Sequence, residues 1–156
     1  MILLTVGTQL PFDRLVSIID DNADSSPMEI HAQIGETEYE AKNIKADKFM
    51  EPDELDKLMD ESKVVISHAG MGTIIKCINL RKPVILFPRL SKLGEHRNDH
   101  QLDTINSFAE LVGVYPAFDE KELVELIKKA DTLTPPSGFK NADRTRLVDF
   151  LKSQMV

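Results

Sequence analysis

Three polar turns interrupt the apolar stretches of the sequence, and they hold the residues best suited to bind a ligand. They are Gly7-Thr8-Gln9, the segment from His68 to Thr73, and the segment from Arg89 to Gln101. A glycine turn that leads into a helix exposes backbone N–H groups at the positive end of the helix dipole. The first two turns therefore predict a phosphate or diphosphate site. Tight strand-to-helix turns also need glycine, so a purely structural role is the alternative.

The second turn reads His68-Ala69-Gly70-Met71-Gly72-Thr73. Its two glycines would let the backbone approach an anion, and the hydroxyl groups of Thr8 and Thr73 could each add a hydrogen bond. His68 directly follows an apolar segment, and an imidazole can gain or lose a proton near neutral pH. It could orient a phosphate, act as a base, or only cap the turn.

The third turn ends in the most polar stretch of the chain, residues 94–101. Its side chains suit a sugar with several hydroxyl groups, although a solvated helix start would have the same composition. His96 and His100 stand four residues apart, as two metal ligands on one helical turn would, but the pattern H-E-x-x-H is not met. No metal site is predicted.

The sequence matches neither of two common nucleotide-binding patterns. Gly70-Met71-Gly72 begins like G-x-G-x-x-G, but Ile75 stands at the third glycine, and Gln33-Ile34-Gly35 supplies no acidic residue after the second strand. The Walker pattern is also missing. An NAD enzyme or a P-loop hydrolase is therefore not expected, and no cofactor is predicted.

The composition fits one soluble domain. The 156 residues are 42% hydrophobic, which is enough for one sizeable core. The net charge is -7 and Lys and Arg do not cluster, so nucleic acid is not an expected partner. Cys77 is the single cysteine, which excludes an internal disulfide and fits a reducing cytoplasm; its apolar helix face favours a buried, inert thiol. No segment reaches the roughly 20 apolar residues of a membrane span.

Short apolar segments alternate with segments of helical spacing along the chain. This alternation predicts a single α/β domain over residues 1–156, with a Rossmann-like, doubly wound parallel sheet and the three turns at its carboxyl edge. The expected strands are 2–6, 28–34, 43–49, 64–67, 83–87 and 112–115, and the expected helices are 12–19, 52–61, 73–80, 98–111, 120–129 and 143–154.

Taken together, the three turns resemble the C-terminal domain of family 28 glycosyltransferases. The resemblance covers about residues 1–127, and the motifs that carry it are 67–73, Lys82-Pro83-Val84-Ile85, Pro88-Arg89 and 94–101. The segment 5–15 resembles the small stand-alone version of this domain. Among such versions, the chain is most similar to the catalytic subunit of bacterial exopolysaccharide glycosyltransferases. The eukaryotic catalytic subunit of the dolichol-linked N-acetylglucosamine transferase is a more distant relative.

The resemblance implies one half of a GT-B architecture, in which two Rossmann-like domains face each other across a cleft. This half would bind the UDP-sugar donor, and a membrane-anchored partner subunit would bind the lipid-linked sugar acceptor. The chain would then be cytoplasmic and peripheral at the inner face of the membrane through that partner. It would transfer a sugar during exopolysaccharide biosynthesis, with glucuronate expected first because Arg89 and Arg97 could pair with its carboxylate. The alternative is a non-catalytic UDP-sugar-binding or enhancer subunit.

The resemblance also implies which residues bind the donor. The catalytic base could come from the partner subunit, and His68 is the candidate within this chain. Phe49 and Met50 fall at the uracil pocket of the family. Lys76 departs from the family pattern, because many relatives carry a glutamate there for the ribose hydroxyls and a lysine cannot accept those hydrogen bonds. The expected donor-binding residues are Gly7, Thr8, Gln9, Phe49, Met50, His68, Ala69, Gly70, Met71, Gly72, Thr73, Arg89, Glu95, Arg97, Asn98 and Gln101.

Overall fold

A computed structural model describes residues 1–7, 10–95, 98–137 and 149 of the chain. The expected terminal helix at 143–154 lies outside these described residues, as do four residues of the polar turns: Thr8, Gln9, His96 and Arg97. Among the described residues, no helix has both the length and the apolar character needed to cross a bilayer.

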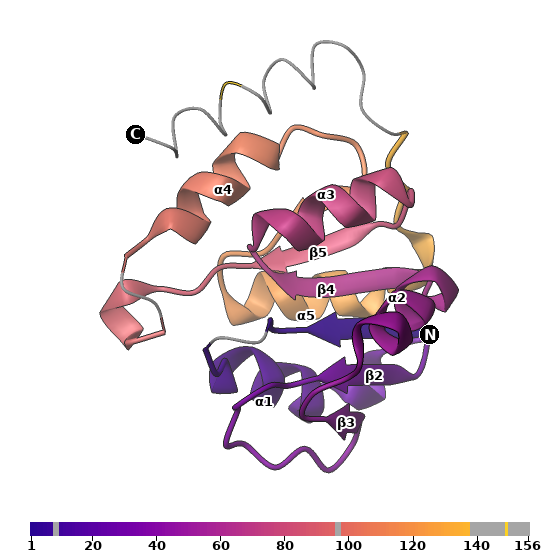
Figure 1. Cartoon of the computed structure of the whole chain (residues 1–156), viewed down its shortest axis with the longest axis vertical. Coiled ribbons are helices and arrows are strands. Elements are labelled where there is room, and N and C mark those ends of the chain that lie inside the picture. Colours follow the sequence, from indigo (N-terminus) through magenta and orange to yellow (C-terminus); the bar gives the residue numbers. More distant parts are fainter. Residues whose placement is uncertain (8–9, 96–97, 138–148, 150–156) are drawn as a thin grey trace.

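Six parallel strands form one sheet in the order β3-β2-β1-β4-β5-β6 (Figure 1). The prediction of an α/β fold with a doubly wound, Rossmann-like parallel sheet is confirmed. The strand order reverses between β1 and β4, and ligands of such sheets bind outside the carboxyl ends of the strands at this switch point. The strands are β1 (Ile2–Thr5), β2 (Ile30–Gln33), β3 (Lys45–Asp47), β4 (Val64–His68), β5 (Val84–Phe87) and β6 (Val114–Pro116).

The helices begin where the sequence offers start signals. Pro52 occupies the first turn of its helix, where a missing N–H costs little. The carboxylate of Asp119 caps another helix by accepting from the N–H of Glu122 at 2.8 Å. The α-helices are α1 (Asp13–Asp21), α2 (Pro52–Glu61), α3 (Met71–Asn79), α4 (His100–Phe108) and α5 (Glu120–Lys128), and the short 3-10 helices are η1 (Ala23–Ser25), η2 (Ser91–Leu93) and η3 (Ala130–Thr132).

Several expected boundaries differ from the structure by one to three residues, and two of these differences have a clear physical cause. The helix expected from residue 98 begins at His100, because the side-chain oxygen of Asn98 accepts from the N–H of His100 at 3.0 Å and holds the preceding residues in a turn. The strand expected over 43–49 is reduced to β3, which is the edge strand of the sheet and is only partly buried. Edge strands have one open side, so fewer residues are held in the ladder.

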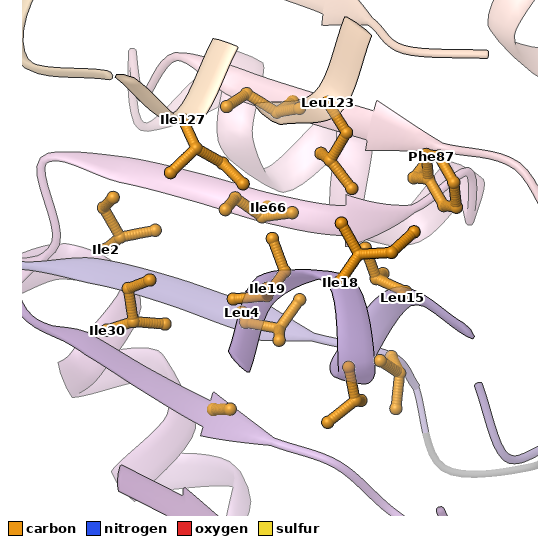
Figure 2. Close-up of a cluster of buried hydrophobic side chains, with 14 of the residues drawn as sticks. Ile2, Leu4, Leu15, Ile18, Ile19, Ile30, Ile66, Phe87, Leu123 and Ile127 are labelled. Carbon is orange, nitrogen blue, oxygen red and sulfur yellow. The ribbon is translucent and has the colours of Figure 1, made fainter. Parts of the chain in front are cut away.

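Helices α1 and α5 cover one face of the sheet. Leu15, Ile18 and Ile19 of α1 meet side chains from the centre of the sheet such as Leu4 and Ile66 (Figure 2). Leu123 and Ile127 of α5 pack into the same cluster. This side of the sheet is an apolar core that fixes the positions of β1, β4 and β5.

Helices α2, α3 and α4 cover the opposite face. The cluster there includes Val65 and Leu86 from the strands, Met59 of α2, and Ile105 of α4. Cys77 of α3 belongs to the same cluster and is fully buried, as the sequence predicts. Burial raises the pKa of its thiol to about 12, so the group is inert at neutral pH.

A buried carboxylate at the end of α1 holds the connection between β2 and β3. The carboxylate of Asp20 accepts from the N–H groups of Lys42 and Asn43, at 3.0 and 2.7 Å, and from the hydroxyl of Tyr39 at 2.9 Å. Burial alone would raise the pKa of Asp20, but these hydrogen bonds outweigh it and lower the pKa below its ordinary 3.8. The same bond to Asp20 raises the pKa of Tyr39 to about 12.

Candidate functional site

The imidazole of His68 joins the first two turns at the carboxyl edge of the sheet. A Cβ atom on Gly7 would lie 3.1 Å from the Cε1 atom of His68, and a Cβ atom on Gly70 would lie 2.9 Å from the same atom. Only glycine lets both backbone segments pack so closely against the ring. The hydroxyl of Ser67 lies 3.3 Å from Nδ1 of His68, on the other side of the imidazole from Gly70. The structure therefore brings Gly7, His68 and Gly70 into one cluster.

The start of α3 presents open backbone N–H groups. Gly70 is its N-cap and supplies no side-chain cap. The N–H groups of Met71, Gly72 and Thr73 donate no hydrogen bond to any described residue, and the first helical bond is from the N–H of Ile74 to the oxygen of Gly70. Unpaired N–H groups at a helix start carry the positive end of the helix dipole. This is the local chemistry that binds phosphate.

The turn after β1 offers a further donor beside this helix start. Gly7 adopts φ +78°, a left-handed conformation that favours glycine. The N–H of Val6, just after β1, still donates to the oxygen of Gln33 on β2. The N–H of Gly7 donates no hydrogen bond to the described residues. The two turns that pack against the His68 ring thus both hold open donors.

Gln101 connects the second and third turns from the first turn of α4. Its side-chain oxygen accepts from the N–H of Ala69 at 3.3 Å and from the N–H of Arg89 at 2.9 Å. All three residues are buried. The sequence predicts Ala69 and Gln101 as contacts of the sugar donor. In the structure, the two hydrogen bonds to Gln101 hold the end of β4 against the end of β5.

The guanidinium group of Arg89 points into the protein. It is 2% exposed and donates to three backbone oxygens that flank the first turn, those of Val6, Leu10 and Pro11, the last at 2.6 Å. The ring of Phe12 lies 4.7 Å from the guanidinium carbon. Burial lowers the pKa of Arg89 to about 10, which leaves it charged at neutral pH. The sequence assigns the guanidinium N–H groups of Arg89 to a ligand. In the structure they donate to backbone oxygens on both sides of the first turn.

Glu95 forms an ion pair with Arg14 across 81 positions of the chain. Its two carboxylate oxygens accept from Nε and Nη2 of Arg14, each at 2.9 Å, and from the N–H of Leu90 at 3.1 Å. Arg14 also lies 4.4 Å from the centre of the Phe87 ring. Glu95, which the sequence predicts as a sugar contact, thus connects the third turn to the start of α1.

The two residues expected at a uracil pocket lie at the same edge of the sheet. The ring of Phe49 is 49% exposed, and its Cε1 atom lies 4.0 Å from where a Cβ atom of Gly35 would be. That same Cβ position is 3.0 Å from the backbone oxygen of Gly7. Met50 is half-buried beside Phe49 in the chain. A flat, exposed aromatic ring near the Gly7 turn can stack on a nucleobase.

The remaining predicted residues fall into two groups. Met71, Thr73 and Asn98 are half-buried near the helix starts, and Met71 packs against the α3-side core. Thr8, Gln9 and Arg97 lie outside the described residues.

Lys76, at the position where many relatives carry the ribose glutamate, forms an ion pair with Asp56 of α2. Both side chains are about half exposed. The pair brings a carboxylate to the surface between α2 and α3, on a neighbouring helix and not on α3 itself.

Two residues important for the site's shape carry no clear signal in the sequence. Arg14 looks like an exposed residue of a helix, and its partner Glu95 is far away in the chain. Thr37 accepts from the N–H of Phe12 at 3.1 Å and so anchors the end of the first turn. The glycine at position 35, two residues before Thr37, is a local hint of a turn there, and it adopts a positive φ in the structure.

Other features of the described residues do not compete with this edge. No group of three or more His, Cys, Asp or Glu side chains among them could hold a metal ion. Two hollows, of about 390 and 400 Å³, lie at the opposite edge of the sheet, where the strands begin; one is lined by Lys63, Val64 and Pro83, and the other by Met1 and Ile30.

Comparison with known proteins gives a consistent result. The profile of the glycosyltransferase family 28 C-terminal domain matches residues 1–150. The UDP-N-acetylglucosamine--N-acetylmuramyl-(pentapeptide) pyrophosphoryl-undecaprenol N-acetylglucosamine transferase of Staphylococcus aureus strain Newman is 31% identical over 159 residues, covering 97% of this chain and 42% of that protein. The same enzyme of strain bovine RF122 is 30% identical. The chain thus spans less than half the length of these relatives.

Solved structures show the same fold. The NMR solution structure of ALG13 aligns with a TM-score of 0.64 and 21% identity, over 94% of this chain and 93% of that one. The glycotransferase of kitacinnamycin aligns with a TM-score of 0.58 and 14% identity, over 96% of this chain and 38% of that one. Such neighbours are GT-B glycosyltransferases, which confirms the predicted half of a GT-B architecture. The chain belongs to the family of glycosyltransferase family 28 C-terminal domains.

Proposed function

We propose that this chain is the donor-binding, catalytic subunit of a UDP-sugar glycosyltransferase. The observation that carries the proposal is the set of open N–H groups, one at Gly7 and three at residues 71–73, whose two turns both contact His68 at the carboxyl edge of the sheet. Such N–H groups would bind the diphosphate and stabilise the negative charge that develops on it as the sugar leaves. The half-exposed Phe49 would stack on the uracil.

The acceptor half of the enzyme would come from a partner. The curated relatives are more than twice as long as the stretch that matches this chain, and their names describe transfer to an undecaprenol-linked substrate. By analogy, we propose a membrane-anchored partner subunit that binds a lipid-linked sugar acceptor and brings this chain to the inner face of the membrane. The proposed process is exopolysaccharide biosynthesis.

The proposed donor sugar is glucuronate, and the structure leaves one of the two arginines that the sequence suggests for its carboxylate. A carboxylate could pair with Arg89 or Arg97, but the guanidinium of Arg89 is buried and bonded to backbone oxygens. The proposal therefore depends on Arg97. Galactose and N-acetylglucosamine are the sugars to compare with it.

Calorimetric titration of the chain tests donor binding directly. Titrants are UDP, UDP-glucuronate, UDP-galactose, UDP-N-acetylglucosamine and NAD. Saturable binding of the UDP compounds without binding of NAD supports the proposal, and the order of affinities ranks the sugars. A chain that binds none of the UDP compounds, alone or with its partner, would contradict it.

His68 is the proposed catalytic residue, and its position between the two turns also suits a contact with the diphosphate. His68→Ala should abolish transfer in the reconstituted enzyme, and Gly70→Val should do the same by displacing the ring. Circular dichroism checks that both variants fold. If both variants transfer sugar as fast as the parent chain, neither His68 nor the second turn belongs to the active site.

A non-catalytic UDP-sugar-binding or enhancer subunit is the second candidate, favoured by one observation. Lys76 replaces an expected ribose-binding glutamate and is paired with Asp56. Reconstitution separates the two functions: a partner that transfers sugar at full rate without this chain would make the chain an accessory.

A further inference from the structure

Arg89 is unusual because it is a buried cation whose hydrogen bonds go to uncharged groups. Its guanidinium donates to the backbone oxygens of Val6, Leu10 and Pro11. No carboxylate among the described residues accepts a hydrogen bond from it; Glu95, the acidic residue whose charge acts on it, is bonded to Arg14. Arg14, Arg89 and Glu95 together carry one surplus positive charge.

Burying a charge without a counter-charge is costly. The protein compensates in part through the three oxygens and the ring of Phe12. An anion bound over the first turn would supply the missing negative charge. The surplus charge lies at the oxygen of Val6, one residue before Gly7, and therefore points to the same ligand chemistry as the open N–H groups do.

The bonds of Arg89 also set the direction of the Gly7 N–H. In a trans peptide the C=O and the following N–H point in opposite directions. Because the oxygen of Val6 is turned inward to Arg89, the N–H of Gly7 is turned away from it. Beyond residues 8 and 9, the oxygens of Leu10 and Pro11 also accept from Arg89, and the N–H of Phe12 donates to the hydroxyl of Thr37.

We propose that Arg89 is the positioning residue of the diphosphate site: by holding the oxygens of Val6, Leu10 and Pro11 it keeps the Gly7 N–H directed at the ligand, and its buried charge favours an anion there. This inference rests on the proposed binding of a UDP-sugar. It assigns Arg89 a role through Gly7 and not through direct contact with the sugar.

The test compares Arg89→Lys with Arg81→Lys by calorimetry with UDP and with inorganic diphosphate. Lysine keeps the charge but cannot donate to three oxygens in the fixed fork geometry of a guanidinium. Arg81 is exposed at the opposite edge of the sheet, so the same substitution there is a matched control. We expect Arg89→Lys to lose at least about tenfold in affinity for both anions, and Arg81→Lys to bind like the parent chain.

A second readout follows the backbone amide of Gly7 by nuclear magnetic resonance. In the parent chain this amide should shift and become protected from exchange when UDP is added, while the amide of Phe12, bonded to Thr37, is protected throughout. In Arg89→Lys the Gly7 resonance should move before UDP is added and respond weakly to it. This pattern differs from a general loss of stability.

The outcomes separate the two proposals. A parent chain that binds neither UDP nor diphosphate, even with its partner, contradicts the proposed function. If the parent chain binds UDP but its Gly7 amide does not respond, the positioning role is overturned, whether or not the variant folds. It is also overturned if Arg89→Lys binds as tightly as the parent chain.

Discussion

The side-chain oxygen of Gln101 lies 2.9 Å from the backbone nitrogen of Arg89, and this bond joins the start of α4 to the end of β5. The same oxygen accepts from Ala69, just after β4. One acceptor thus satisfies two buried N–H groups on neighbouring strands, and it connects the second turn of the site to the third.

Gln101→Leu is expected to destabilise the protein. Leucine fills a similar volume but leaves the N–H groups of Ala69 and Arg89 unpaired inside the protein, and each unpaired donor costs roughly 1–3 kcal/mol. We expect the free energy of unfolding, measured with urea, to fall by roughly 2–4 kcal/mol.

Two control variants make this measurement specific. Gln101→Glu keeps an oxygen that can accept, so it should lose less stability than the leucine variant. Asn106→Leu changes an exposed residue of the same helix and should have little effect. Equal unfolding midpoints for Gln101→Leu and the parent chain would show that the two N–H groups have other acceptors.

Gly72→Ala should weaken UDP binding without weakening the fold. A Cβ atom on Gly72 meets nothing within 4 Å, so the substitution costs no clash within the protein. The new methyl group would stand among the open N–H groups at the start of α3, where the diphosphate is proposed to bind. We expect about a tenfold loss of affinity, about 1.4 kcal/mol, measured by calorimetry at an unchanged melting temperature.

Asn79→Ala, at the far end of the same helix, is the control for this experiment. It should leave UDP affinity unchanged because α3 runs away from the carboxyl edge of the sheet. If Gly72→Ala and Asn79→Ala both bind UDP like the parent chain, the start of α3 does not contact the diphosphate.

The fold could be predicted because its signals are local. Apolar runs such as 64–67 mark buried strands, and the bounds of α2, predicted as 52–61, are confirmed because Pro52 marks its start. The alternation of strands and helices then allows few topologies, and the parallel order found here is one of them. The carboxyl-edge position of the three turns follows from that order.

The hydrogen bonds and the ion pair that connect the three turns could not be predicted, because they join residues that are distant in the sequence. Arg89 is bonded to oxygens 78 to 83 positions earlier, and Arg14 is paired with a glutamate 81 positions later. From the sequence, Arg89 and Glu95 have the polar character of ligand contacts. Only the fold reveals that their donors and acceptors are bonded to the backbone turns and to Arg14.

Cys77 should not react with thiol reagents while the protein is folded. The thiolate is the reactive form, and burial raises the pKa of this thiol to about 12, so almost none is present at neutral pH. Ellman's reagent should therefore label the chain only after a denaturant is added. Rapid labelling of the folded protein would mean that α3 opens readily, which would contradict its close packing against Ile105 and Phe108.

Asp20→Asn should destabilise the protein in a pH-dependent way. The pKa of Asp20 is lower in the folded chain than its ordinary 3.8, so its carboxylate stabilises the fold above that value, and the contribution is lost as the pH falls through the folded pKa. An asparagine side chain has one acceptor oxygen where Asp20 has two. Its NH2 group would therefore face one of the donors from Lys42, Asn43 or Tyr39, and that donor would lose its acceptor. We expect a loss of roughly 1–3 kcal/mol at neutral pH.

The comparison of both proteins across pH tests the cause. The difference in unfolding free energy should stay constant from neutral pH down to about pH 5 and shrink below the ordinary aspartate pKa near 4, where Asp20 begins to be protonated in the unfolded chain. Asp24→Asn, an exposed aspartate nearby, should show no such difference. A difference for Asp20→Asn that does not change as the pH falls would mean that shape, and not the carboxylate charge, holds the connection between β2 and β3.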